Sequence, residues 1–315
     1  MKKLNQVILL VTLVFINWLS FAQDFPNKPI QIIVGSGADQ IARLLSERMS
    51  DVWSQPVIVE QRLAAGGMIA GDTVAKSTPD GSTILLSSSA YPILQALRPK
   101  MPFNYFEDLK PVIMFTKSTF VLVINQQIPV NNFTDLIQLA RQRSLNFGSV
   151  GVGTTSHIGG EMLNQQANIK LTHIPYKNFP SAITDLIGGQ IQMVFAPLSS
   201  VLPLIKDGKL KPLGVSTDIR DQYIPTVPTF TELGYPNINF IGWNGFHVSS
   251  KTPEKTVQRI FTDIAKIINT PEFRKKAELA GYQLTVMDSK EFGDFQAKDF
   301  NRVDSIIKNA QIKID

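Results

Sequence analysis

The sequence predicts an α/β fold in which two series of strands and helices follow one another along the chain. Three features carry this prediction: short apolar runs of strand length, helical spacing of apolar residues between them, and Gly- or Pro-containing turns where the pattern changes. Strands that alternate with helices form mostly parallel sheets, and ligands lie beyond the carboxyl ends of such strands. We therefore expect mostly parallel sheets, with a candidate site in the loops at their strand ends.

Residues 1–22 are expected to be a secretory signal peptide that is not part of the fold. Lys2 and Lys3 precede an apolar run from Val7 to Ile16, and Ser20-Phe21-Ala22 has the small-x-small pattern of a cleavage site. Cleavage near Ala22 would leave an exported mature chain. An uncleaved membrane anchor is the alternative, but the apolar run is short for a membrane span.

The composition excludes several classes of site. With no cysteine, the chain has no disulfide, no thiol nucleophile and no thiolate metal ligand. Its 43% hydrophobic and 18% charged residues are ordinary for a globular protein. The formal charge is +5, but lysines and arginines form no runs interleaved with aromatic residues, so we expect no nucleic-acid partner.

The first series begins directly after the signal. Its elements are an apolar strand, a glycine-containing loop, a helix that Asp39 is placed to cap, two further strands and a second helix. In order they are Ile30–Val34, Gly35-Ser36-Gly37-Ala38-Asp39, a helix through Trp53, Val57–Glu60, a helix from Ala65 to Ala75, and Thr83–Leu86 followed by Ser87-Ser88-Ser89. The next stretch, Tyr91 to Lys110, is less periodic.

The second series occupies the middle of the chain and contains its own strand ends. The expected strands are Pro111–Phe115, Phe120–Ile124, a strand-like run that enters the stretch beginning at Asn146, Leu171–Ile174, Ile191–Phe195 before Ala196-Pro197, and Pro212–Ser216. The expected helices are Thr134–Arg143, one that opens at Thr154-Thr155-Ser156, one from Pro180 to Gly188, and Val201–Ile205. No flexible linker separates the two series, so we expect the chain to cross directly between two lobes near Val121–Ile124 and Trp243–Val248.

The last part of the chain is predicted to be helical. Thr252-Pro253 and Thr270-Pro271 each have the form of a helix cap followed by a first-turn proline, and Asp288 with Glu291 has the form of a capping box. The apolar residues behind these starts recur at helical spacing. We interpret these stripes as core rather than as cofactor contacts.

The stretch Asn146–Gly160 is the strongest candidate for a binding loop. Three glycines free its backbone, and hydroxylated residues open a helix whose first N–H groups lack partners, which favours an anion. A dinucleotide site is disfavoured because Ser156 stands where the fingerprint needs glycine, and a Walker loop because Thr154 follows Gly153 where lysine is required. A tight turn with a capped helix remains the alternative to binding.

No catalytic or metal constellation is evident. Ser156 and His157 are neighbours and point in different directions on a helix, so they form a poor nucleophile–base pair. The three histidines, His157, His173 and His247, are scattered without metal spacing, and we interpret each as a hydrogen-bonded polar residue or a wall of the cleft. We expect no cofactor, no metal and no enzymatic activity.

Several motifs in order along the mature chain resemble one known family, the solute receptors of tripartite tricarboxylate transporters, also called the Bug family. The matching motifs are Asn146-Phe147-Gly148-Ser149-x-Gly151-x-Gly153-Thr154-x-Ser156-His157, His173-Ile174-Pro175-Tyr176-Lys177, Thr184-Asp185-Leu186-Ile187-Gly188-Gly189-Gln190-Ile191-Gln192, Asp39-x-Ile41-Ala42-Arg43, Gln55-Pro56-Val57, Ala65-Gly66-Gly67, Ala75-Lys76-Ser77-x-Pro79-Asp80-Gly81, Lys206-x-Gly208-Lys209-Leu210 and Pro225-x-Val227-Pro228-Thr229.

The resemblance implies a two-lobed periplasmic binding protein of type II, a Venus-flytrap whose hinge is two crossover strands. It implies that residues 23–121 and 246–315 form lobe 1 and that residues 122–245 form lobe 2. The lobes would close on a small organic acid anion, a di- or tricarboxylate, held by backbone amides and hydroxyls. The implied ligand-binding residues are Gly35, Ser36, Gly37, Ala38, Asp39, Ser87, Ser88, Ser89, Gly153, Thr154, Thr155, Ser156, His157, Tyr176, Ala196 and Pro197.

Two departures from the family pattern bear on the ligand. The loop from Gly35 to Asp39 lacks about four residues of the family's first loop, so we expect a cleft that is more open or admits a larger ligand. Ala196 stands where many relatives have Asp or Asn. That change favours plain organic acids over amino-dicarboxylates such as aspartate.

The resemblance also implies partners and a location. We expect a periplasmic monomer that passes its ligand to the integral membrane subunits of a tripartite tricarboxylate-type transporter. A signalling protein of the same fold that presents its ligand to a sensor without feeding transport is the alternative. An exported hydrolase is a third hypothesis, and it would require substrate turnover that depends on Ser156 or His157.

Overall fold

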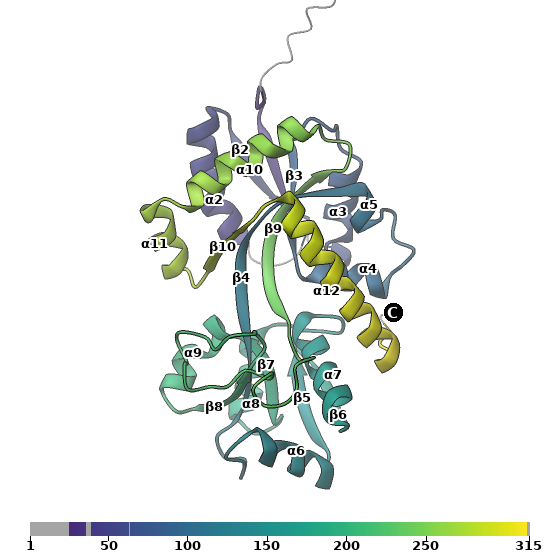
Figure 1. Ribbon diagram of the computed structural model, residues 1–315, viewed down its shortest axis with the longest axis vertical. Helices are drawn as coiled ribbons and strands as arrows, with labels where there is room; N and C mark the ends of the chain where they lie inside the picture. Colours follow the sequence, from purple (N-terminus) through teal and green to yellow (C-terminus); the bar gives the residue numbers. More distant parts are fainter. Residues whose placement is uncertain (1–24, 36–38, 63, 314–315) are drawn as a thin grey trace, which may run out of the picture.

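Two lobes, one above the other in Figure 1, are joined by the long strands β4 (Leu109–Asn125) and β9 (Ile241–Ser249). The structure, a computed structural model, describes residues 25–35, 39–62 and 64–313. The predicted signal peptide, 1–22, lies outside the described residues, as do 36–38 of the predicted first loop. We use lobe 1 for the part built around β1, β2 and β3, and lobe 2 for the part built around β5, β6 and β7.

Lobe 1 is built on three parallel strands, β1 (Ile30–Val34), β2 (Val57–Gln61) and β3 (Thr83–Ser88), with β1 in the middle. Strand β1 has five residues, and three of them are branched aliphatics that face one core cluster and have no exposed surface: Ile30, Ile32 and Val34. This is expected for a strand that has a neighbour on each side. The helices between these strands and after them are α2 (Asp39–Trp53), the 3₁₀ turn η1 (Ala64–Gly67), α3 (Met68–Ala75), α4 (Ala90–Leu97) and α5 (Tyr105–Asp108).

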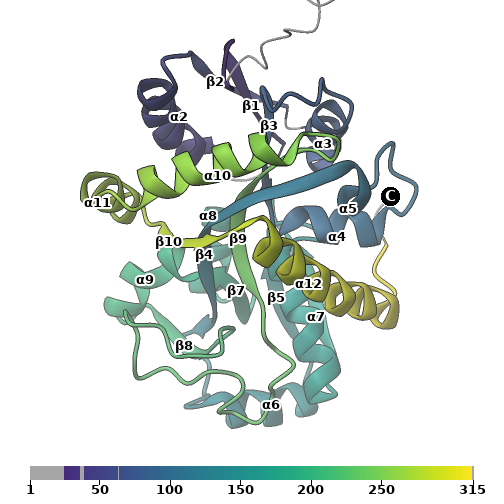
Figure 2. The ribbon, with the colours of Figure 1, turned by 45° about the horizontal axis from the view of Figure 1, so that its top comes forward.

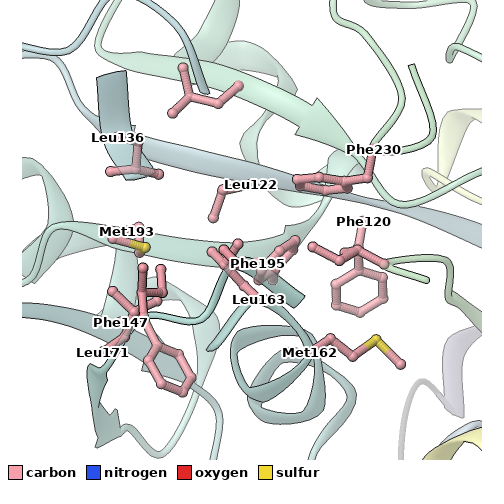
Figure 3. Close-up of a cluster of buried hydrophobic side chains, with 14 of the residues drawn as sticks. Phe120, Leu122, Leu136, Phe147, Met162, Leu163, Leu171, Met193, Phe195 and Phe230 are labelled. Atoms are coloured by element: carbon pink, nitrogen blue, oxygen red, sulfur yellow. The ribbon is translucent and has the colours of Figure 1, made fainter. Parts of the chain in front are cut away.

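Lobe 2 repeats the arrangement with β5 (Leu145–Ser149) between β6 (Leu171–Pro175) and β7 (Met193–Pro197), all parallel. A cluster of buried hydrophobic side chains lies on each face of this sheet; Figure 3 shows Phe147 and Phe195 in one of the two clusters. The other elements of lobe 2 are α6 (Phe133–Gln142), α7 (Thr155–Ala167), α8 (Phe179–Ile187), α9 (Leu198–Lys206) and β8 (Leu210–Val215).

Strand β4 belongs to both sheets. Its first part, Leu109–Thr119, pairs with β9, and its last part, Phe120–Asn125, pairs with β7 and β8; all of these pairings are antiparallel. The parallel pairs therefore lie in the outer parts of the sheet and the antiparallel pairs at the centre, which makes the sheet mixed. The strands expected to cross between lobes near Val121–Ile124 and Trp243–Val248 are these two strands. The division of the chain at 121/122 and 245/246 stays a prediction.

The last helix spans the two lobes. Helix α12 (Ser289–Ala310) follows α10 (Glu254–Ile268), α11 (Pro271–Leu279) and β10 (Gln283–Met287), and it packs on both α4 and α7 (Figure 2). Its start carries the predicted capping box, with Asp288 accepting from the Glu291 amide and Glu291 accepting from the Asp288 amide. Near its end, Val303 and Ile307 are buried in the lobe 2 core. The helix therefore ties the lobes together beside the crossover strands.

Three elements, α4, α5 and β10, were not predicted. The stretch from Tyr91 to Lys110 contains α4 and α5, which are eight and four residues long and so give little periodicity. Strand β10 is half-buried at every position and shows no alternation between buried and exposed residues. Within the described residues, no helix has the length and apolar character needed to cross a membrane.

Candidate functional site

The predicted anion-binding loop connects β5 to α7 in lobe 2. Gly151 and Gly153 have φ values of 122° and 75°, a region that disfavours residues with a side chain. Helix α7 begins at Thr155, directly after these glycines. The glycines therefore allow the strand to turn sharply into the helix, and the helix N-terminus lies at the strand end, where the sequence placed it.

The hydroxyls of this loop hydrogen-bond within the loop itself. Thr154 Oγ1 donates to the Gly151 carbonyl at 2.8 Å and lies 3.1 Å from Ser156 Oγ. Because the single proton of Thr154 goes to Gly151, the Ser156 hydroxyl donates to Thr154, and Ser156 accepts in turn from the Val150 amide. Both side chains thus fix the loop. The donors left for an anion are the first amides of α7, which have no partner inside the helix.

The N-terminus of α7 meets the end of β3 from lobe 1. Ser89 Oγ lies 3.0 Å from Thr155 Oγ1, and the Ser89 amide donates to the Trp243 carbonyl on β9. The structure thus brings one part of Ser87–Ser89 against one part of Gly153–His157, across the interface between the lobes. Both hydroxyls are neutral donors and acceptors, which suits an anionic ligand that is bound without a formal countercharge.

Ser87 lies inside lobe 1 instead of at this interface. It has no exposed surface, its hydroxyl donates to the Gly245 carbonyl at 3.0 Å, and it lies 2.7 Å from His247 Nδ1. His247 Nε2 is in turn 3.1 Å from the Tyr105 hydroxyl. This Ser–His pair resembles a nucleophile and its base, but both side chains are buried in the core. The pair therefore stabilises lobe 1 and has no access to a substrate.

The first loop is described at its two ends, Gly35 and Asp39. A Cβ on Gly35 would overlap the Tyr91 hydroxyl and the side chain of Ala70, so close packing requires glycine there. Asp39 is the first residue of α2, and its Oδ2 accepts from Arg43 Nε at 3.0 Å and from Gln61 Nε2 at 2.7 Å. Instead of serving as the predicted cap, the side chain joins α2 to the end of β2. The remaining predicted residues, Ser36, Gly37 and Ala38, lie outside the described residues.

The other predicted residues lie at strand ends of lobe 2. The Tyr176 hydroxyl donates to Asp185 Oδ2 at 2.8 Å, and burial followed by this carboxylate raises the pKa of Tyr176 to about 12. Ala196 is fully buried and pairs with Val121 of β4, so its side chain presents no polar group. Pro197 ends β7 and precedes α9.

Two histidines stand behind the anion loop. The rings of His157 and His173 are stacked with centroids 3.8 Å apart, and Phe147 stacks on His173 at 5.0 Å. Burial lowers the pKa of His157 to about 3 and that of His173 to about 4, so both rings are neutral at physiological pH. Glu161 on α7 is partly buried, and its Oε1 lies 3.7 Å from His157 Nε2. No sequence signal pairs the two histidines, because the pairing depends on β5 lying beside β6.

Two adjoining cavities of about 380 and 260 Å³ lie between the lobes, on the side of β10 and α9. They share Lys117 and Thr119 on β4 and Tyr282 beside β10, and the smaller one reaches Ser199, two residues after Pro197. Among the described residues of the predicted site, none lines either cavity. The sequence did not point to Lys117 as a site residue. This lysine interrupts an apolar strand pattern, and it lines the cavities only because the two lobes come together around β4.

No metal centre is evident in the part of the chain that the structure describes: no three or more His, Asp or Glu side chains are grouped to hold an ion. What the arrangement offers is a helix N-terminus and neutral hydroxyls at the interface of two lobes. This chemistry suits reversible binding of an anion more than bond cleavage.

Comparison with known proteins gives matches over most of the chain. Residues 41–312 match the family described as tripartite tricarboxylate transporter family receptor. A "UPF0065 protein in tcbD-tcbE intergenic region" of Pseudomonas sp. (strain P51) is 33% identical over 255 residues, which cover 79% of this chain and 76% of the relative. Protein BugT of Bordetella pertussis is 34% identical over 244 residues, 75% of each chain.

A solved structure gives the same result for the fold. Rpa4515 of R. palustris, solved with adipate, is 25% identical to this chain with a TM-score of 0.78, and the match covers 92% of this chain and 99% of that one. Its agreement extends over both lobes, and the family model spans all elements from α2 to α12. This protein therefore belongs to the tripartite tricarboxylate transporter receptor family, whose members are solute-binding receptors of the two-lobed periplasmic binding protein fold.

Proposed function

We propose that the protein is an extracytoplasmic receptor that binds a small dicarboxylate between its lobes and delivers it to the membrane subunits of a tripartite tricarboxylate-type transporter. The observation that carries the proposal is the contact between Ser89 and Thr155, which places the N-terminus of α7 at the interface between the lobes. A carboxylate there would accept from amides that have no partner inside the helix. The adipate held by Rpa4515 supports a plain dicarboxylate.

The proposal includes export and excludes catalysis. The basic and apolar pattern of residues 1–22 supports cleavage near Ala22 and a periplasmic location. The Ser87–His247 pair is buried, and Ser156 donates to Thr154, so neither serine is set up as a nucleophile. The proposal also holds that the receptor acts as a monomer.

The test measures thermal unfolding of the mature chain with malonate, succinate, malate, glutarate, adipate and citrate. A ligand that binds only the folded state stabilises it by about 2.7 kcal/mol at a hundred times its dissociation constant, so a true ligand raises the Tm in a concentration-dependent way. The dimethyl ester of the same acid should have no effect. If every acid left the Tm unchanged, carboxylate binding would be rejected.

A matched pair of variants locates the binding site. Thr155→Glu places a negative charge at the N-terminus of α7, where it repels an anion, whereas Thr184→Glu places the same charge on the exposed face of α8. We expect the first variant to lose the ligand-induced rise in Tm and the second to keep it. Equal responses would move the site away from α7.

The signalling alternative shares the binding step and differs in its consequence. In a strain that lacks this protein, a role in transport predicts loss of uptake of the acid that raises the Tm. Signalling predicts unchanged uptake together with altered expression of genes that respond to the ligand.

A further inference from the structure

The loop that carries the α7 N-terminus is held at its end by a histidine. The amide of Gly153 donates to His157 Nδ1 at 3.0 Å. An imidazole nitrogen that accepts a hydrogen bond carries no proton, so the proton of the neutral ring is on Nε2, which faces Glu161 Oε1 at 3.7 Å. The structure therefore specifies one tautomer of His157. This tautomer keeps Gly153 in its left-handed conformation, with φ of 75°.

A second histidine holds the start of the same loop. The Ser149 hydroxyl donates to the Gly151 carbonyl at 2.9 Å and accepts from the Gly151 amide at 3.1 Å. The single proton of the Ser149 hydroxyl therefore goes to Gly151. His173 Nε2 lies 2.6 Å from Ser149 Oγ, so Nε2 must be the donor in this hydrogen bond. Each ring thus carries a proton on Nε2. The accepting Nδ1 makes His157 neutral, and burial lowers the pKa of His173 to about 4, so His173 is neutral at physiological pH as well.

The two rings support each other as well as the loop. They are stacked at 3.8 Å with an angle of 20° between their planes, and the Phe147 ring lies beside both, 5.0 Å from His173 and 6.0 Å from His157. Two imidazolium rings at this distance would repel, and burial opposes a charge on either of them. The groups that face the pair are Glu161 from α7 and the Ser149 hydroxyl from β5.

We propose that His157 is a positioning residue for ligand binding, which acts through Gly153 by fixing the turn that aims the first amides of α7 at the interface between the lobes. The ligand would touch these amides, whereas His157, which is 5% exposed, would lie behind them. This inference rests on the proposed function for its consequence in binding, but the tautomer and the loop geometry can be tested in the free protein.

The experiment compares His157→Asn with His157→Leu. The Asn side chain places an oxygen where Nδ1 stands and can accept from Gly153, whereas Leu is of similar size and offers no acceptor. Affinity for the best dicarboxylate of the panel is measured by calorimetry at pH 7. We expect His157→Leu to weaken binding at least about tenfold, because a misplaced turn would cost one hydrogen bond between an α7 amide and the anion, which is worth about that factor. We expect His157→Asn to remain within about threefold of the wild type. Equal affinities in the two variants would overturn the proposal.

A second measurement uses the free wild-type protein and does not depend on any ligand. The ¹⁵N spectrum of the histidine side chains should show Nδ1 of His157 unprotonated, and the Gly153 amide should exchange slowly with solvent. A proton on Nδ1, or fast exchange of Gly153, would overturn the inference even if the receptor binds carboxylates. If the spectrum agrees and no acid binds, the proposed function fails while the loop geometry stands.

Discussion

The hydroxyl oxygens of Ser89 and Thr155 lie 3.0 Å apart and join the end of β3 in lobe 1 to the first residue of α7 in lobe 2. The residues are 66 positions apart in the chain and meet only because β4 and β9 set the lobes against each other. The contact lies at the predicted site, so we expect the two hydroxyls to be coupled in ligand binding.

A double-mutant cycle with Ser89→Ala and Thr155→Val tests this coupling. We expect each single variant to weaken ligand binding by about 0.5–1.5 kcal/mol and the double variant to lose less than the sum, because the two share one hydrogen bond. Calorimetric titration of the four proteins gives the coupling energy. Ser144→Ala with Thr172→Val is the matched control, since that exposed pair lies 3.5 Å apart within lobe 2. Strictly additive losses in the first cycle would contradict the coupling.

Gly160 should be intolerant of any side chain. A Cβ at this position on α7 would overlap the Phe147 ring, which is itself fully buried in the lobe 2 core. Gly160→Ala should therefore lower the free energy of unfolding by about 1–3 kcal/mol, as overpacked core positions do. Urea denaturation of the variant and the wild type measures the difference.

Gly293 on α12 provides the opposite case. A Cβ there meets Pro111 Cγ at 3.5 Å, an ordinary contact, and the position is inside a helix. Gly293→Ala should raise the free energy of unfolding by up to about 1 kcal/mol, because alanine is the better helix former. A Gly160→Ala variant as stable as the wild type would contradict the packing described for Gly160, and a loss of stability in Gly293→Ala would contradict the open packing at Gly293.

Sequence reasoning succeeded where a local pattern decides the structure. The capping box of Asp288 and Glu291 is present, and the proline-containing starts of α8 and α11 fall where the sequence placed them. Each of these signals depends on residues within one helical turn. The same is true of the glycines that turn β5 into α7.

The same reasoning failed where a contact depends on the fold. Nothing local says that Ser87 is buried against His247 or that Asp39 binds Gln61. Strand neighbours set these partners, and the direction of a hydroxyl proton follows from the partners. The residue types of the site were therefore predictable, whereas the division between ligand contacts and loop supports was not.

The start of α12 offers a prediction about the helix that bridges the lobes. Asp288 accepts from the Glu291 amide at 2.9 Å. Asp288→Ala should lower the free energy of unfolding by about 1 kcal/mol, as expected for a lost N-cap. Asp304→Ala is the control, because its contact with Lys308 is an i,i+4 pair on the helix surface. Urea denaturation should show the larger loss for Asp288→Ala; an equal loss would mean that the cap is not stabilising.

The buried histidines predict that the protein becomes less stable in acid. Burial lowers the pKa of His157 and of His247 to about 3, and it lowers that of His173 to about 4, whereas in the unfolded chain each is near 6.5. Between these values the unfolded state binds protons that the folded state does not. The free energy of unfolding should therefore be highest above pH 6.5 and should fall as the pH falls toward 4.

Part of the slope of this loss can be assigned to one ring, that of His247. His247 is fully buried between Ser87 and Tyr105, so it should contribute up to about 1.4 kcal/mol per pH unit over the window. Urea denaturation at pH 7, 6 and 5 measures the slope, and His247→Gln should reduce it even if that variant is less stable at every pH. An exposed histidine would give no such slope, because its pKa would be the same in both states. An unchanged slope in the variant would show that His247 is already protonated in the folded protein.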